Sequence, residues 1–186
     1  MRSSFRRKVE SLDDIFAFAA KFESDSGLDD SESYFLDLTL EELFTNLVRH
    51  APGKDDIEIE KSLESGLPKC YGDAHLVEQV LLNLINNAAK AMGKNQTAKR
   101  IQIASYCKDE RLFIQVSDSG PGIPKELRDK VFDPFFTTHN DGSGIGLSIA
   151  QRIVADHNGT IEILSSKWGG ATLSVELPIE KRGHST

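Results

Sequence analysis

A glycine-rich hexapeptide, Gly142-Ser-Gly-Ile-Gly-Leu147, leads directly into a segment whose apolar residues have helical spacing, Leu147 to His157. Glycines at a helix entrance let the backbone approach a ligand closely, and the first amides of the helix have no partner within it. Such a helix start binds anions readily, so phosphate is the expected ligand. The same pattern also occurs in plain tight turns, and the hexapeptide alone leaves both interpretations open.

The composition is that of an ordinary globular domain. The 186 residues are 39% hydrophobic and 27% charged, which suits one domain with at most a small appendage. The net charge of −7 argues against non-specific binding to nucleic acid, which requires a basic face. No apolar run approaches the roughly 20 residues of a membrane span, and we see no signal peptide. We therefore expect a cytoplasmic domain with Cys70 and Cys107 as reduced thiols.

The order of the expected elements indicates an α+β fold. Helical periodicity marks residues 5–22, about 39–50, and the segment that Asp73 caps. Alternation predicts five strands, at 57–63, 101–107, 112–117, 160–165 and 171–177. Because no regular strand–helix–strand repeat is present, we expect a two-layer sandwich of a mixed, mostly antiparallel sheet with helices on one face. The expected organisation is a helical segment with an acidic loop at 1–35, a main domain at 36–180 and a polar tail at 181–186.

Three polar residues interrupt the apolar stripe of the helix after Asp73. Asn83, Asn87 and Lys90 share one face of that helix, whereas Asn86 lies on another. An amide oxygen is a neutral hard ligand suited to Mg²⁺, and a lysine beside it can meet a phosphate as a point charge. A solvated helix face without a ligand is the alternative, and this pattern alone favours that alternative.

An acidic residue followed by glycines, Asp118-Ser-Gly-Pro-Gly122, ends the strand expected at 112–117. The stretch is compatible with a simple turn. It could equally place a carboxylate where it accepts a hydrogen bond from a ligand's amino group, with Gly120 and Gly122 clearing room for a flat ring. A site built in this way discriminates sharply against analogues that lack the amino group.

Four stretches occur in the order of a known set of boxes. The segments 83–90, 118–122, 132–138 and 142–147 resemble the N, G1, F and G2 boxes of the catalytic and ATP-binding domain of sensor histidine kinases. That domain has the Bergerat-type ATP-binding fold, which gyrase, the heat-shock chaperones and the mismatch-repair ATPases share. The resemblance covers roughly residues 36–178, and it implies a Mg-ATP-binding catalytic domain of a two-component-type histidine kinase.

The resemblance also implies roles for single residues. Asn87 would be the Mg²⁺ ligand, with Asn83 and Lys90 beside the phosphates, while Asp118 would accept from the adenine amino group with Thr172 supporting it through water. Residues from about 124 to 143 would be a mobile lid over the nucleotide, pinned by Phe132, Phe135 and Phe136. The other nucleotide-binding residues that the resemblance implies are Gly120, Gly122, Ile123, Gly142, Ser143, Gly144, Ile145, Gly146 and Leu147.

One position bears on the reaction. ATP-hydrolysing relatives carry a glutamate one turn before the metal-binding asparagine, as the base for the attacking water, whereas this chain has Asn83 there. Because an amide cannot take up that proton, we expect slow hydrolysis and a γ-phosphoryl group left for another nucleophile. None of the five histidines is followed by an acid, as a phosphoacceptor histidine would be, so the acceptor histidine would be supplied elsewhere and autophosphorylation of this chain is not expected. A response regulator would be a further partner, and a homodimer is possible.

A second resemblance concerns the stretch Leu40 to Ala51, which looks like the metal-binding helix of anti-sigma-factor serine kinases. In that alignment Glu42 would be the base and Asn46 the Mg²⁺ ligand, and the partners would be a sigma factor and its antagonist. Asn46 and Asn87 cannot both be the metal ligand, because the glycine boxes follow only once. The spacing to Asp118 favours Asn87. A nucleotide-gated interaction module or a hybrid chain without kinase activity is the remaining alternative.

Overall fold

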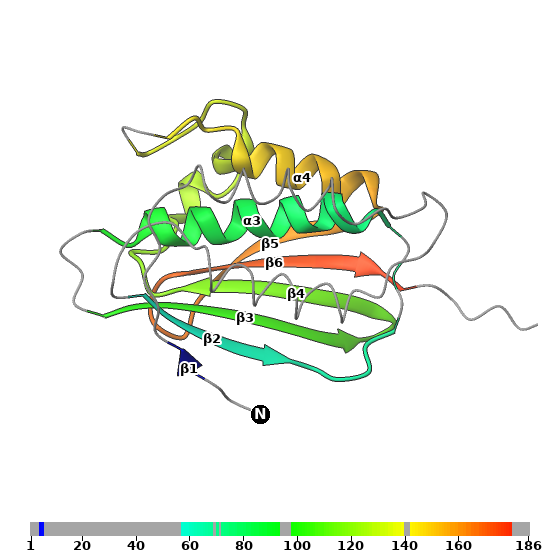
Figure 1. Cartoon of the computed structure of the whole chain (residues 1–186). Helices are drawn as coiled ribbons and strands as arrows, with labels where there is room; N and C mark the ends of the chain where they lie inside the picture. Colours follow the sequence, from blue (N-terminus) through cyan, green and yellow to red (C-terminus); the bar gives the residue numbers. More distant parts are fainter. Residues whose placement is uncertain are drawn as a thin grey trace, which may run out of the picture.

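The computed structural model describes residues 4–5, 57–68, 70, 72–93, 98–139 and 142–179. These residues form one mixed sheet, and helices α3 (Ala74–Ala91) and α4 (Gly146–Asp156) lie against each other on the same face of it (Figure 1). Two short 3₁₀ helices, η1 (Lys125–Leu127) and η2 (Lys130–Phe132), connect the sheet to α4. The α+β sandwich expected from the sequence is confirmed.

The sheet in this described part of the chain has the strand order β1-β2-β3-β4-β6-β5. β2 and β3 run parallel, and every other neighbouring pair is antiparallel, so the expectation of a mixed, mostly antiparallel sheet is confirmed. The strands are β1 (Ser4–Phe5), β2 (Ile57–Leu63), β3 (Lys99–Lys108), β4 (Arg111–Asp118), β5 (Thr160–Ser165) and β6 (Ala171–Pro178).

β3 and β4 form the hairpin that the charged turn predicts. Lys108 pairs with Arg111, which leaves a two-residue turn of Asp109 and Glu110. Both turn residues have positive φ, 50° and 56°, as the tight hairpin turn that matches the twist of its strands requires. This turn fixes the register that carries Asp118 to the end of β4.

The core lies between the sheet and the two helices. Alternate residues of β3 and β4 are buried, and α3 packs on this face of both strands. Each fully buried aliphatic side chain stabilises the fold by about 1.5–3 kcal/mol relative to exposure. The apolar stripe expected on α3 is buried throughout: Val77, Val80, Leu81, Leu84, Ile85 and Ala88. α4 contributes Ala150, Ile153 and Val154 to the same core.

The start of α3 is capped and tied to the end of α4. Asp73 Oδ1 accepts hydrogen bonds from the backbone N–H of His75 and Leu76, which confirms the expected cap. The backbone N–H of Asp73 donates to His157 Nε2 at 3.0 Å, and His157 Nδ1 lies 2.7 Å from Ile153 O. The imidazole therefore acts as a neutral bridge that donates from Nδ1 and accepts at Nε2.

Several expectations lie outside the described residues. They are the helices at 6–22 and 39–50, the positions of Glu42 and Asn46, and the boundaries of the main domain at 36 and 180. The expectation that Phe5 begins a helix is wrong, because Phe5 pairs with Ile59 in a strand. The exposed edge of β2 offers backbone hydrogen-bond partners there that local periodicity does not reveal. Within the described ranges, no helix is long and apolar enough to cross a membrane.

Candidate functional site

Asp118 ends β4 with its side chain on the helix-covered face of the sheet, where it is 4% exposed. Its Oδ1 accepts hydrogen bonds from the backbone N–H of Gly120, at 2.7 Å, and of Ala171, at 3.3 Å. Burial raises the pKa of Asp118 above its ordinary value, and the two backbone hydrogen bonds partly offset this by favouring the charged form. Since both bonds from described residues fall on Oδ1, Oδ2 is the oxygen that can accept from a ligand.

The β5–β6 turn packs directly against this acid. A Cβ added to Gly170 would overlap the carbonyl oxygen and Oδ1 of Asp118, so only glycine fits there. Ser166 is 9% exposed, and its Oγ donates to Asp118 O at 2.6 Å. Two segments 48 residues apart in sequence therefore meet at Asp118 without room for another atom between them.

The structure does not bring Thr172 to Asp118. Thr172 pairs with Ser117 across the β4–β6 ladder, and the two hydroxyl oxygens lie 2.7 Å apart. Neighbouring residues of a strand point to opposite faces, so Ser117 and Thr172 lie on the face away from Asp118. Ala171 occupies the position beside the acid instead. The sequence pattern also predicts this placement. Leu173, Val175 and Leu177 alternate toward the core, so Thr172 lies on the other face of the sheet.

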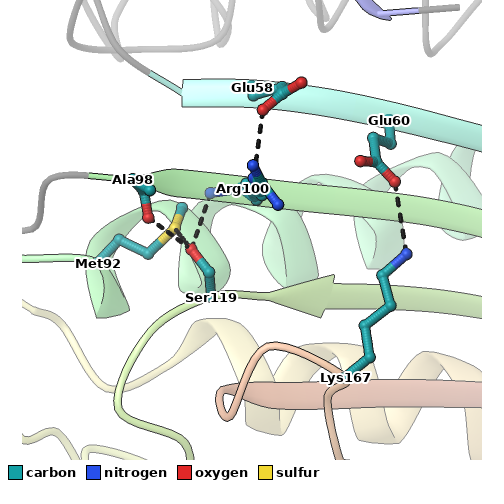
Figure 2. Close-up of polar contacts among 7 residues, drawn as sticks. All are labelled: Glu58, Glu60, Met92, Ala98, Arg100, Ser119 and Lys167. Atoms are coloured by element: carbon teal, nitrogen blue, oxygen red, sulfur yellow. Dashed lines mark hydrogen bonds and ion pairs between the residues drawn. The ribbon is translucent and has the colours of Figure 1, made fainter.

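Ser119 fixes the segment after Asp118 to β3 and to the end of α3 (Figure 2). Its Oγ accepts from Arg100 N at 2.8 Å and lies 3.1 Å from Ala98 O and 3.4 Å from Met92 Sδ. Its backbone N–H donates to Arg100 O. Two ion pairs, of Glu58 with Arg100 and of Glu60 with Lys167, lie next to this cluster in Figure 2. The turn at Gly120 is thus held by its neighbours on both sides.

α3 connects the Asp118 turn with the start of α4. A Cβ on Gly120 would lie 3.3 Å from Ala91 O, and a Cβ on Gly146 would lie 3.4 Å from Asn83 Oδ1. Asn87 is half-buried and Lys90 is exposed on the helix between these two points. Asn83 Nδ2 is buried and has no hydrogen-bond partner among the described residues. The fold therefore brings the N, G1 and G2 stretches together along α3.

The glycine segment is tied to the phenylalanine-rich stretch through backbone atoms. Phe135 N donates to Gly144 O at 2.9 Å, and a Cβ on Gly144, which has φ +68°, would overlap the Phe135 backbone. Phe132 packs against the core, but the Phe135 ring is 75% exposed. The Phe135 ring therefore faces solvent, and Phe135 contacts the glycine segment through its backbone.

The remaining G2 residues surround the start of α4. Ile145 is the N-cap residue and has no side chain able to cap, and the helix begins at Gly146, one residue before the expected start. Gly142 N donates to His139 O, Ser143 is exposed and Leu147 packs against the core. The first amides of α4 thus lack a capping side chain and lie beside Asn83.

The segment expected to form the lid is anchored at its beginning by Arg128. The guanidinium donates to Ile123 O at 3.3 Å and to Ile163 O on β5 at 3.0 Å. Gly122, just before this segment, has φ +76° and lies against the β5–β6 turn. Arg128, Ser119 and Ser166 were not identified from the sequence, because their partners are remote and no local period marks them. The Gly169-Gly170 turn after Ser166 was the only local signal.

Residues 72–181, more than half of the chain, match the family described as histidine kinase-, DNA gyrase B- and HSP90-like ATPases. This chain belongs to that family. The match includes Asp118, Asn87 and all four boxes, and it leaves out Glu42 and Asn46. Nothing in it favours the anti-sigma alternative.

The relatives place the chain in the histidine kinase branch. It is 38% identical over 140 residues to the signal transduction histidine-protein kinase AtoS of Escherichia coli K12, covering 75% of this chain and 23% of AtoS. It is also 38% identical over 136 residues to the sensory histidine kinase/phosphatase NtrB of E. coli O157:H7, covering 68% of this chain and 38% of NtrB. The chain thus spans less than half the length of these curated relatives.

Solved structures agree with this placement. The catalytic domain of histidine kinase ThkA has a TM-score of 0.64 and 31% identity, over 77% of this chain and 94% of that domain. The mycobacterial sensor histidine kinase MprB has a TM-score of 0.66 and 26% identity, over 78% of this chain and 95% of that one. The chain is an ATP-binding catalytic domain of the histidine kinase type.

Proposed function

We propose that this histidine kinase domain binds Mg-ATP between α3, the Asp118 turn and the start of α4, and presents the γ-phosphoryl group to a histidine outside the domain. The observation that carries the proposal is the buried Asp118 carboxylate, whose Oδ1 is held by two backbone N–H groups while Oδ2 stays available. A nucleotide without an amino group would leave this buried oxygen without a donor, which is costly.

The phosphates would lie at the other end of the polar face of α3. Asn83 Nδ2 is a buried donor that needs an acceptor, and the uncapped first turn of α4 beside it attracts anions. Lys90, exposed about two turns further along the same helix, adds a positive charge to this face. These groups support a triphosphate here better than a neutral ligand, because each one is a donor or a cation.

Mg²⁺ fits the donors on this face. Among the described residues, no cluster of three or more His, Cys, Asp or Glu side chains could hold a metal ion. A cation here would be held by the Asn87 amide oxygen together with phosphate oxygens, which is how Mg²⁺ is commonly bound. When bound, the ion supplies charge neutralisation on the phosphates. Asn87, Asn83 and Lys90 would orient them.

The nature of residue 83 supports transfer over hydrolysis. An asparagine cannot activate water by removing its proton, so the γ-phosphorus is attacked by an imidazole nitrogen of the acceptor while the bond to the bridging oxygen breaks and ADP leaves. His157 cannot be that acceptor in the folded domain, since both of its ring nitrogens are engaged. A response regulator would then take the phosphoryl group from the acceptor.

Two measurements test this function. Calorimetric titration of Mg-ATP into the wild type, Asn87→Ala and Asn46→Ala should show a loss of about tenfold or more only in Asn87→Ala, as expected for losing a hydrogen bond or ligand to a charged group. A loss only in Asn46→Ala would restore the anti-sigma interpretation. Radiolabelled ATP should then give an acid-labile label on the acceptor-helix domain of a related histidine kinase, and none on the same domain without its histidine. Tight binding without any transfer would leave a nucleotide-gated module as the function.

A further inference from the structure

We propose that Ser166 is a positioning residue for adenine recognition. It fixes the position of the Asp118 carboxylate through the Asp118 backbone and the β5–β6 turn, without touching the nucleotide. The inference rests on the proposed function, in which Asp118 accepts from the adenine amino group. Ser166 lies in the turn between β5 and β6, and Asp118 lies at the end of β4, so only the folded sheet brings them together.

All the hydrogen-bonding capacity of the Ser166 hydroxyl is used. It donates to Asp118 O at 2.6 Å and accepts from Trp168 N at 3.1 Å and from Gly170 N at 3.2 Å. A serine hydroxyl has one proton to donate and two lone pairs to accept with. Because the side chain is also buried, its orientation is fixed and no water competes for these bonds.

These bonds hold both groups on which the carboxylate depends. One fixes the backbone of Asp118 itself. The other two shape the turn that delivers Ala171 N to Asp118 Oδ1, a turn that the backbone bonds Ser166 N to Gly170 O and Gly169 N to Ser166 O also close. Without Oγ, the turn loses its link to β4, and the donor at Ala171 and the acceptor at Asp118 are free to separate. The direction of Oδ2 then becomes less well defined.

Ser174 provides a matched control. It is as deeply buried as Ser166, at 5% exposure, and it belongs to β6, the strand that follows the turn. Its Oγ accepts from Gln115 Nε2 at 3.1 Å on the face of the sheet away from Asp118. Ser174→Ala therefore removes a buried serine hydroxyl nearby and leaves the bonds to Asp118 intact.

The test compares two nucleotides on the full 186-residue chain by calorimetry with Mg²⁺ present. One is ATP, and the other is purine riboside triphosphate, which lacks the exocyclic amino group. The preference for ATP, measured as the ratio of the two affinities, should be tenfold or more in the wild type and fall by about tenfold in Ser166→Ala, the effect expected for a misplaced hydrogen bond to a charged group. Ser166→Thr, which keeps the hydroxyl, should restore the preference, and Ser174→Ala should keep it.

The purine riboside triphosphate separates positioning from general damage. A positioning role leaves its affinity in Ser166→Ala close to the wild-type value, because its phosphates bind elsewhere. Equal losses for both nucleotides would overturn the inference. If Ser166→Ala does not fold, Ser166→Cys takes its place, since the longer and weaker bonds of a thiol should also lower the preference. An unchanged preference in that variant would overturn the inference as well.

Asp118→Asn distinguishes failure of this inference from failure of the proposed function. If Asp118→Asn keeps the wild-type preference for ATP, Asp118 does not read the amino group and the proposed function itself is wrong. If Asp118→Asn loses the preference while Ser166→Ala keeps it, the proposed function stands and only the role of Ser166 is refuted.

Discussion

The two ends of the candidate site are built differently. Around Asp118 the described polar groups hold the carboxylate in place: two backbone N–H groups reach Oδ1, and Ser166 and Ser119 fix the flanking segments. Around Asn83 a buried amide has no described partner and the first turn of α4 has no capping side chain. The Asp118 end, which is the proposed base-binding end, is thus preorganised by the protein. The Asn83 end, which is the proposed phosphate-binding end, has donors that the nucleotide itself would satisfy.

This difference separates recognition of the base from binding of the phosphates. A site that selects a base must hold its acceptor in one place, since a carboxylate that can turn away discriminates poorly. A site that holds phosphates for transfer needs donors that remain available until the nucleotide arrives. The two ends share α3 as a common rigid support, because its apolar stripe is buried in the core.

The largest expected effect is at the base-binding end. Asp118→Asn puts an amide donor where the adenine amino group also donates, so we expect ATP affinity to fall about 100-fold, close to the upper range for hydrogen bonds to charged groups. Calorimetry with ATP measures this loss. The affinity for inorganic triphosphate should not change. A parallel loss for triphosphate would show that the two ends are not separate.

A smaller effect is expected from the phosphate-binding end. Gly144→Ala forces a side chain into φ +68° and against the Phe135 backbone, a strain of about 1–3 kcal/mol. ATP affinity should fall about tenfold while adenosine affinity stays the same, measured by calorimetry. Gly93→Ala, whose added Cβ meets nothing within 4 Å, is the matched control and should bind both ligands normally. Weaker adenosine binding in Gly144→Ala would contradict the separation.

A pH effect on stability should come from Asp118. Burial raises the pKa of this carboxyl in the folded state, so the folded protein binds that proton more tightly than the unfolded chain does. Its contribution to stability is full below the unfolded pKa, near the ordinary value of about 4, and is lost as pH rises through the raised folded pKa. Without nucleotide, the Tm of the wild type relative to that of Asp118→Asn should therefore fall as the pH rises above about 4, the ordinary pKa of an aspartate. A constant difference would refute this.

The smallest effect concerns a group remote from both ends. Ser105 Oγ on β3 is buried and has no hydrogen-bond partner among the described residues. Ser105→Ala removes this unsatisfied hydroxyl, so urea unfolding should give a free energy that is unchanged or higher by up to about 1 kcal/mol. Nucleotide affinity should stay at the wild-type value. Destabilisation by more than about 1 kcal/mol would show that the hydroxyl has a partner after all.

Much of the fold follows from the sequence by itself. The period of two predicts β2 to β6, the period of 3.6 predicts the buried stripe of α3, and Asp73 predicts its cap. The order of the four boxes also identifies the family. The resemblance implied that Thr172 supports Asp118, but the alternation of its own strand already places Thr172 on the opposite face of the sheet.

The tertiary structure decided which remote groups meet. Ser166 reaches Asp118 across 48 residues, His157 reaches Asp73 across 84, and Arg128 reaches Ile163 across 35. None of these pairs belongs to a repeating pattern, because each depends on the registers of several strands and on the packing of α4 against α3. Local periodicity shows on which face of its strand or helix a residue lies, but only the assembled sheet determines which remote residues lie opposite it. For that reason the sequence alone indicated Asp118, whereas its contact with Ser166 was found only in the structure.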